Sequence, residues 1–260
     1  MPVRVLLLAV LLLGPLAATA QERPPIAPDR PGVGVDAELV PRGAFQIETG
    51  IDYARERKAG EPTERRTSAA LMLRYGLLDS LELFIDGEPV VALRNGEDVT
   101  DVGDIELGLK WRLLDGDEGT WRPTLTLAPS VKLPTARAPI GNERVDVTVL
   151  GIASWQTGPL TVDFNAGVAA VAQHKPAGYL LQALLLAAVT GEVTERFKVL
   201  GELFYNSRDE RDSRDLVGAT AGVSYLVTRD LALDAAVITT LVGKGPEYRL
   251  QAGVSMRFWP

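Results

Sequence analysis

Apolar and polar residues alternate one by one along most of the chain. In residues 104–113 the apolar set is Ile105, Leu107, Leu109, Trp111 and Leu113, and the other set is Asp104, Glu106, Gly108, Lys110 and Arg112. A period of two places the two sets on opposite faces of a β-strand, whereas a helix would mix them. The pattern therefore predicts strands with one apolar and one polar face.

Similar runs recur at 43–53, 71–76, 81–86, 124–133, 145–149, 160–165, 198–206, 217–225, 231–237 and 248–258. With 104–113 and one ambiguous stretch at 177–190, they give about twelve strand candidates, each of about ten residues, a length that suits a tilted membrane-spanning strand. An even number of strands is typical of a bacterial barrel. We predict an all-β fold, an antiparallel transmembrane β-barrel of about 12 strands over residues 43–260.

The stretch 179–189 is ambiguous because leucine and alanine fill both parities. Periodicity alone allows a buried helix as well as a strand. The flanking Gly178 and Gly191 favour a strand, and a twelfth strand makes the count even.

The connections between these runs alternate in length. Every second link is short (78–79, 157–159 and 228–230), and most of the others are longer and charged (54–67, 94–101, 134–143 and 206–214). Outer-membrane barrels have short periplasmic turns and longer outer loops. The pattern fits a barrel with both termini in the periplasm, although 115–120 is long and 243–246 is short for their positions.

The N-terminal residues predict export. Arg4 precedes an apolar run from Val5 to Leu13, and small residues at 18–20 form a cleavage site, so we expect a signal peptide over 1–20. An uncleaved anchor would need about 20 apolar residues. Residues 21–42 contain five prolines and no alternation, which predicts an extended lead-in, either in the periplasm or folded into the barrel mouth. We expect the bacterial outer membrane as the location.

Composition excludes several classes of protein. Without residues 1–20, which hold one base and no acid, the chain carries 26 bases and 34 acids, a net charge of −8. An acidic balance disfavours nucleic acid as a partner. There is no cysteine, and after residue 20 no run of 18 apolar residues predicts a membrane-spanning helix.

Charged residues on the polar faces must avoid lipid, because Arg or Lys at the bilayer midplane costs about 2–4 kcal/mol. We expect these side chains to face the lumen. The acids are Glu48, Asp52, Glu82, Asp86, Asp104, Glu106, Asp146, Asp163, Glu202 and Asp234, and the bases are Arg74, Lys110, Arg112, Lys132, Lys198, Arg249 and Arg257. They could line a polar pore or binding wall, or neutralise one another in a filled interior. The excess of acids over bases hints that the lumen would prefer cations.

One arc of the expected inner wall is apolar. Its residues are Leu150, Ile152, Leu180, Leu184, Leu186, Leu200 and Phe204. Such an arc could carry an apolar substrate or pack against residues 21–42. A one-residue slip in register would turn the whole set outward.

Catalytic chemistry has little support in the sequence. His174 is the only histidine, and no serine lies within six residues of it, although nucleophilic catalysis needs a paired base. The acidic run 209–212 could hold a hard cation, but a charged loop tip explains it equally well. We expect no enzyme activity, no catalytic residues, no metal and no cofactor.

Several motifs resemble a family of outer-membrane transporters known as the "MetA-pathway of phenol degradation" family. They are PDRPG at 28–32, GAFQIETG at 43–50, RYGLLD at 74–79, GDIELGLKWR at 103–112 and PSVKLPT at 129–135. The glycine expected after Thr135 is missing. The resemblance implies an outer-membrane location and uptake of aromatic compounds. The alternating final strand, ending at Phe258, similarly resembles the signal read by the barrel assembly machinery, although Trp259 and Pro260 follow it.

The first hypothesis is therefore a passive channel or binding barrel for small molecules of unknown identity, including hydrophobic ones, embedded in outer-membrane lipid. The others are a structural or assembly barrel with a filled lumen, an outer-membrane enzyme, and a soluble periplasmic β-protein with its apolar parity inward. Outward aromatic residues near strand ends, such as Tyr75, Trp111 and Phe258, fit interfacial girdles and argue against the soluble form.

Overall fold

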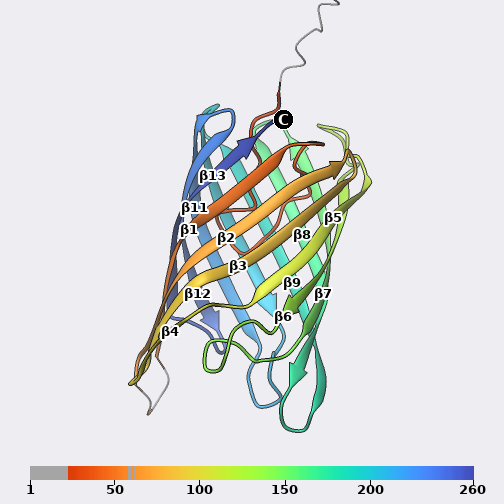
Figure 1. The fold of residues 1–260 in the computed structure, drawn as a ribbon. Helices are drawn as coiled ribbons and strands as arrows, with labels where there is room; N and C mark the ends of the chain where they lie inside the picture. The colour runs from red at the N-terminus through yellow and green to blue at the C-terminus, as the bar shows by residue number, and fades with distance from the viewer. Residues whose placement is uncertain (1–22, 58–59, 61) are drawn as a thin grey trace, which may run out of the picture.

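The computed structural model describes residues 23–57, 60 and 62–260. Twelve antiparallel strands close into one barrel, and a short thirteenth strand lies at its edge (Figure 1). The predicted fold class is thereby confirmed. No helix in the described ranges is long and apolar enough to cross a membrane. The expected signal peptide, 1–20, lies outside the described residues.

Each strand pairs with its neighbours in chain order. The strands are β1 (Phe45–Glu56), β2 (Glu64–Leu78), β3 (Leu81–Arg94), β4 (Asp98–Asp101), β5 (Ile105–Leu114), β6 (Thr124–Leu133), β7 (Asp146–Thr157), β8 (Leu160–Gln173), β9 (Gly178–Glu192), β10 (Phe197–Asn206), β11 (Leu216–Thr228), β12 (Leu231–Val242) and β13 (Tyr248–Phe258). The first and last strands pair from Phe45↔Phe258 to Arg55↔Tyr248 and close the ring. Among the described residues, β4 pairs with the end of β3 alone, and the two form an antiparallel hairpin outside the closed ring.

Strand parity separates the two faces of the wall. On β5 the side chain of Lys110 is 1% exposed, while its neighbour Trp111 is 50% exposed. Most of the exposed large apolar residues lie on the strands with this outward parity, for example Leu107, Leu185 and Leu203. The barrel thus has an apolar outer surface and a polar interior, as in a membrane-spanning β-barrel.

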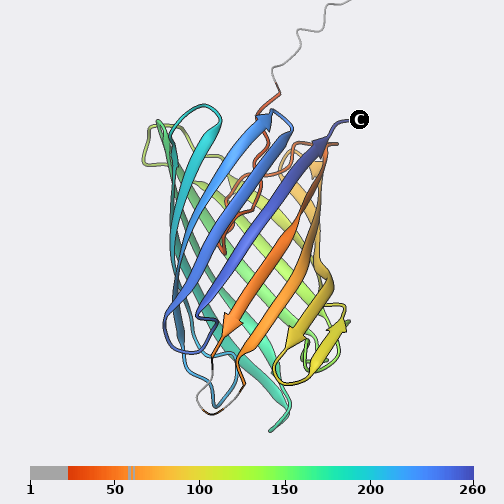
Figure 2. The ribbon, with the colours of Figure 1, turned by 90° about the vertical axis from the view of Figure 1, so that its left-hand side faces the viewer.

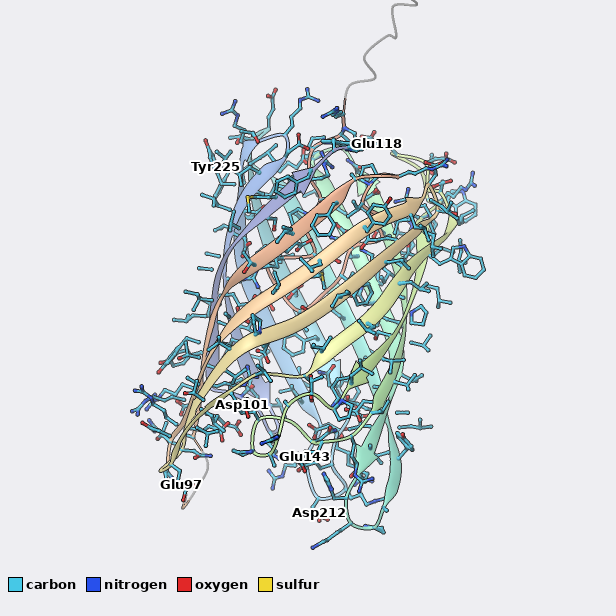
Figure 3. All side chains as sticks on the ribbon, in the orientation of Figure 1. Glu97, Asp101, Glu118, Glu143, Asp212 and Tyr225 are labelled. Atoms are coloured by element: carbon cyan, nitrogen blue, oxygen red, sulfur yellow. The ribbon has the colours of Figure 1, made fainter. Side chains whose placement is uncertain are left out.

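Both ends of the described chain lie at one end of the barrel (Figures 1 and 2). The tight turns 79–80, 158–159 and 229–230 lie at this terminal end, and the longer links 134–145 and 207–215 lie at the opposite, loop end. Glu97, Asp101, Glu143 and Asp212 mark the charged loop end in Figure 3.

The stretch 179–189 lies within strand β9, so the prediction of a strand is confirmed. Two predicted loop boundaries are wrong. The ladder of β1 and β2 continues to Glu56↔Glu64, which shortens the expected loop 54–67. Within the expected loop 94–101, residues 98–101 form β4. In both places charged residues sit in paired strands that project past the apolar band, where polarity is a poor guide to strand ends.

Candidate functional site in the barrel lumen

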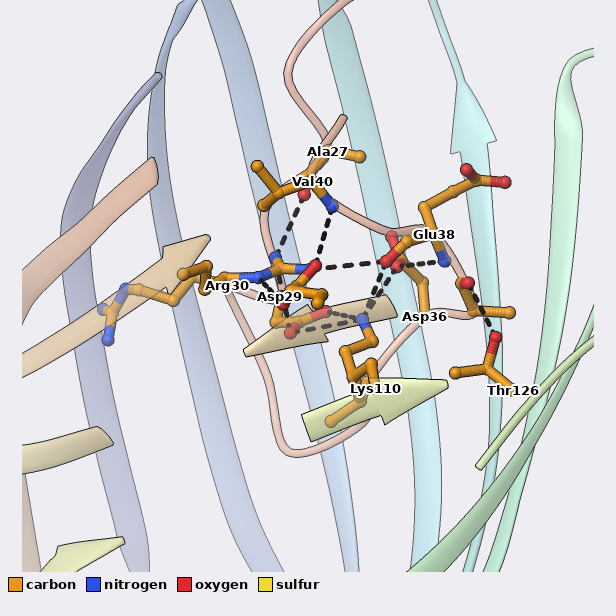
Figure 4. Close-up of polar contacts among 12 residues, drawn as sticks. Ala27, Asp29, Arg30, Asp36, Glu38, Val40, Lys110 and Thr126 are labelled. Carbon is orange, nitrogen blue, oxygen red and sulfur yellow. Dashed lines mark hydrogen bonds and ion pairs between the residues drawn. The ribbon is translucent and has the colours of Figure 1, made fainter. Parts of the chain in front are cut away.

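Residues 23–42, which we call the lumenal segment, run inside the barrel near its terminal end (Figures 2 and 4). Its prolines prevent regular pairing because they lack the N–H donor that a ladder needs. The only bridge between the segment and the sheet, among the described residues, is Arg42↔Gly76. An unpaired backbone inside a barrel must find other hydrogen-bond partners.

Inward carboxylates of the wall supply those partners. Glu48 accepts hydrogen bonds from the amides of Asp29 and Arg30 at 3.2 and 3.1 Å. Glu202 accepts from Val33 and Gly34 at 3.0 and 2.9 Å. These interactions hold the middle of the lumenal segment against two different arcs of the wall.

The C-terminal half of the segment is held in the same way. Asn165 accepts from the Val35 amide at 2.9 Å and donates to its carbonyl at 2.8 Å, as a neighbouring strand would. Glu82 accepts from the Val40 amide at 2.7 Å. The wall therefore replaces the missing ladder with side chains.

Arg74 is the centre of a buried charge network. Its guanidinium is 0% exposed and donates to Glu48 at 2.8 Å and to Glu82 at 2.6 and 3.0 Å. Asp29 of the segment lies 3.3 Å from the same group. Because a buried charge is costly without partners, Arg74 depends on both the wall and the lumenal segment.

Lys110 makes the second ionic link to the segment. Its Nζ lies 3.0 Å from Asp29 Oδ1 and 3.6 Å from Asp36 Oδ1, and it donates to the Glu38 carbonyl at 2.9 Å (Figure 4). Arg30 points to another arc, with NH2 3.4 Å from Asp234 and 3.7 Å from Asp52. The segment thus carries charges that complement those of the wall.

Apolar contacts add to this fit. Val35 and Ala37 of the segment pack against Leu150 and Ile152 on β7. A Cβ added at Gly34 would lie 2.7 Å from Leu186 Cδ2, so glycine allows the segment to approach β9. The structure thus places the segment against part of the apolar arc.

The rest of the apolar arc forms a second cluster on the inner wall. Leu186 and Phe204 pack with Ile238, and Leu200 joins them. Leu184 and Leu180 on β9 are half-buried. The arc is therefore divided between a part under the segment and a part beside it.

The charged residues expected to face the lumen are buried or half-buried, except that the side chain of Lys198 is 45% exposed. Three of the bases not yet placed form ion pairs: Arg112 with Glu38, Lys132 with Asp104 and Asp146, and Lys198 with Glu192. Arg257 donates hydrogen bonds to Asp230 and to the Pro25 carbonyl, and Asp163 accepts one from Ser154. Asp86 lies opposite Glu106 on the neighbouring strand. Arg249 alone among the predicted bases makes no hydrogen bond or ion pair to the described residues.

Sequence reasoning missed several contributors to the lumen. Uncharged Gln46, Asn165 and Gln251 share the inward parity and contact the segment or its partners, and their parity could have identified them. Arg66 and Glu88 form a bidentate pair, but Arg66 fell in a predicted loop. Had the predicted strands been drawn as long as β2 and β3 are, their parity would have identified both residues as lumen-facing.

The remaining candidate groups lie at the loop end. His174 Nε2 lies 2.8 Å from the Asn142 carbonyl, and Arg144 Nε lies 3.4 Å from His174 Nδ1. Residues 209–212 line a cavity of about 310 Å³ beside it. Within the described ranges, no three His, Asp or Glu side chains gather as a metal site would require.

The family comparison covers both the barrel and its lumenal segment. Residues 28–258 match the family described as "Putative MetA-pathway of phenol degradation". The chain belongs to this family. The match begins at Pro28, so it covers residues 28–42 of the lumenal segment as well as the barrel. None of the curated proteins matches the chain.

Solved structures share the barrel at low sequence identity. The COG4313 outer membrane channel from Pseudomonas putida F1 is 17% identical with a TM-score of 0.67, and the alignment covers 88% of this chain and 100% of the channel. The NanC porin is 13% identical with a TM-score of 0.55, covering 82% and 98%. The KdgM porin in complex with disordered oligogalacturonate is 11% identical with a TM-score of 0.52, covering 80% and 99%. These likenesses establish an outer-membrane β-barrel fold.

Proposed function

We propose that this protein is a passive outer-membrane channel for small molecules, narrowed from within by the lumenal segment. The observation that carries this proposal is the inner wall itself. Polar and charged side chains turn inward over most of the wall, beside one apolar arc, while the outer face is apolar. A solute crossing the barrel would meet a hydrated, charged path.

The relatives support a channel more than an enzyme. The structures that share the fold are named as a channel and two porins. The family description names phenol degradation, so we propose small aromatic compounds as the solutes. The apolar arc, with Leu186 and Phe204 on the inner wall, would contact such rings as they pass.

The proposed path into the membrane follows from the two ends of the chain. Residues 1–20 would direct export as a cleaved signal peptide. The alternating strand β13 would be read by the barrel assembly machinery before the outer face meets lipid. The terminal end would then face the periplasm, and the charged loop end the exterior.

A second function, a structural barrel without transport, is favoured by one observation. The lumenal segment is bonded to the wall along its length, and Arg74 beneath it is fully buried. A segment fitted so closely could fill the lumen at its level. The two functions differ in whether solutes pass.

Swelling of liposomes that contain the refolded protein separates them. In isotonic solutions of a pentose, a disaccharide and a trisaccharide, the channel predicts swelling with the smallest solute and progressively less with the larger ones. Protein-free liposomes are the control. Absence of swelling with every solute, from protein that shows heat-modifiable gel migration, would favour the structural barrel.

A further inference from the structure

A small cavity lies on the inner wall at the loop end of the barrel. Its volume is about 260 Å³, and its lining residues are Ala54, Glu56, Glu64, Arg66, Pro246 and Arg249. They come from β1, β2, β13 and the link before β13. This volume is just below the range of pockets for drug-sized ligands, so the cavity suits a smaller molecule.

The strand register explains why two arginines meet here. Ala54 on β1 pairs with Arg66 on one side and with Arg249 on the other. Directly paired residues point to the same face of a sheet, and adjacent strands lie about 4.8 Å apart. The small side chain of Ala54 therefore leaves a gap between two inward guanidinium groups.

The two arginines differ in their partners. Arg66 NH1 donates to Glu88 Oε1 at 2.6 Å and to Ser68 Oγ at 3.1 Å, and its NH2 donates to Glu88 Oε2. Arg249 makes no such hydrogen bond to the described residues, and its Nε is buried without a hydrogen bond, although the carboxylates of Asp52 and Glu88 act on it electrostatically. Arg74 and Arg257, deeper in the lumen, are both paired with carboxylates.

A cationic side chain with a buried, unpaired donor calls for an explanation beyond packing. The guanidinium group presents parallel N–H donors that match the two oxygens of a carboxylate. The acids on the cavity rim, Glu56 and Glu64, have interactions of their own. Arg249 is thus the cavity's available anion-binding group.

The cavity also lies next to the lumenal segment. Two residues along β13, on the same face, Gln251 accepts a hydrogen bond from the Gly32 amide at 3.1 Å. Gln251 also donates to Asp52 at 3.0 Å. A solute held at Arg249 would therefore sit where the segment begins to narrow the lumen from the loop end.

We propose that Arg249 binds the carboxylate of a small organic acid at this point, with Ala54 and Pro246 contacting its carbon frame. This inference rests on the proposed channel function and specifies one class of solute, small carboxylates. It predicts that a carboxylate is held better than a neutral compound of the same shape.

Calorimetric titration of the refolded, detergent-solubilised protein with benzoate and with benzamide tests the proposal. We expect saturable benzoate binding, with benzamide about tenfold weaker or undetectable, because the amide loses the charge-assisted pair. Arg249→Gln should weaken benzoate binding by about tenfold or more. The matched control is Arg55→Gln, since Arg55 lies on the neighbouring outward position and pairs with Glu247 at 3.0 Å; it should bind benzoate as the wild type does.

Equal affinities for benzoate and benzamide, or no benzoate binding to the wild type, would overturn the proposal without recourse to any variant. Unchanged benzoate binding in a folded Arg249→Gln protein would overturn it as well. Ion conductance of the same wild-type preparation in planar bilayers tests the channel function separately. If the protein conducts ions but does not discriminate between benzoate and benzamide, only the proposed carboxylate site is overturned. If it binds benzoate but does not conduct ions, only the proposed channel function is overturned.

Discussion

The Nζ of Lys110 on β5 lies 3.0 Å from Oδ1 of Asp29 in the lumenal segment, and both side chains are almost fully buried. This ion pair joins residues that are 81 positions apart in the chain. It fixes a proline-rich, unpaired stretch inside a barrel whose strands do not hydrogen-bond to it regularly. The lumenal segment is therefore an integral part of the interior.

Loss of the Lys110 charge should destabilise the barrel. Lys110→Met removes one of the two cations beside Asp29, the other being Arg74, and also removes the cation 3.6 Å from Asp36. Breaking a buried pair costs up to about 3–5 kcal/mol. Urea unfolding in lipid vesicles measures the difference. Lys244→Met is the matched control, because Lys244 forms an exposed pair with Glu210 and such pairs contribute about 0–1 kcal/mol. Equal effects of the two substitutions would show that the Lys110 pair does not hold the segment.

The parity of β5 predicts opposite responses at adjacent positions. Leu107 faces outward and Glu106 has the inward parity. Leu107→Arg should lower the free energy of unfolding in vesicles by up to about 2–4 kcal/mol, because the cost of a charge on the lipid face depends on its depth and is largest at the midplane. Glu106→Gln should change that free energy little and shift ion preference away from cations. Similar stability losses at both positions would contradict the assignment of faces.

Gly76 on β2 should be needed for the lumenal segment to reach the wall. A Cβ at this position would lie 2.2 Å from the Pro41 carbonyl oxygen and 2.3 Å from that of Val40. Because both are backbone atoms, Gly76→Ala should displace the end of the segment and cost about 1–3 kcal/mol. Gly191→Ala, with its nearest contact at 3.5 Å, is the control in the same unfolding assay. If the loss at Gly76 persists in a protein lacking residues 23–41, its cause lies elsewhere.

The tight turn before β12 should make the terminal end acid-sensitive. Burial alone would raise the pKa of Asp230, but hydrogen bonds from Trp259 and Arg257 and nearby positive charge lower it below 3.8. The stabilisation is therefore complete above that ordinary value and lost as pH falls through the lower folded-state pKa. Between neutral pH and about pH 3, the urea midpoint of the wild type should fall more than that of Asp230→Asn. Parallel declines would show that Asp230 makes no such contribution.

The fold was predictable because each spanning strand repeats one physical requirement, apolar toward lipid and polar toward the lumen. Even β9, with leucine and alanine on both parities, followed from its flanking glycines and the even count. The boundaries near Glu56, Glu64 and Asp98 were not predictable in this way, because strands that project beyond the membrane lose the apolar signal.

The site was predictable only in part. Parity alone selected Glu48, Arg74 and Lys110, but it could not indicate that they contact the lumenal segment. That segment has no periodicity, and its position depends on single contacts such as Asp29 to Lys110 and Val33 to Glu202. Long-range pairing of this kind leaves no local pattern in a sequence.

Single-channel conductance in planar bilayers, compared between the wild type and a variant lacking residues 23–40, tests the central claim most directly. The account predicts small, steady conductance steps in the wild type and steps several times larger in the variant, because removal of the segment widens the lumen. Heat-modifiable gel migration confirms that both proteins are folded. Identical conductance in the two folded proteins, or none in the wild type, would contradict a conducting lumen narrowed by the lumenal segment.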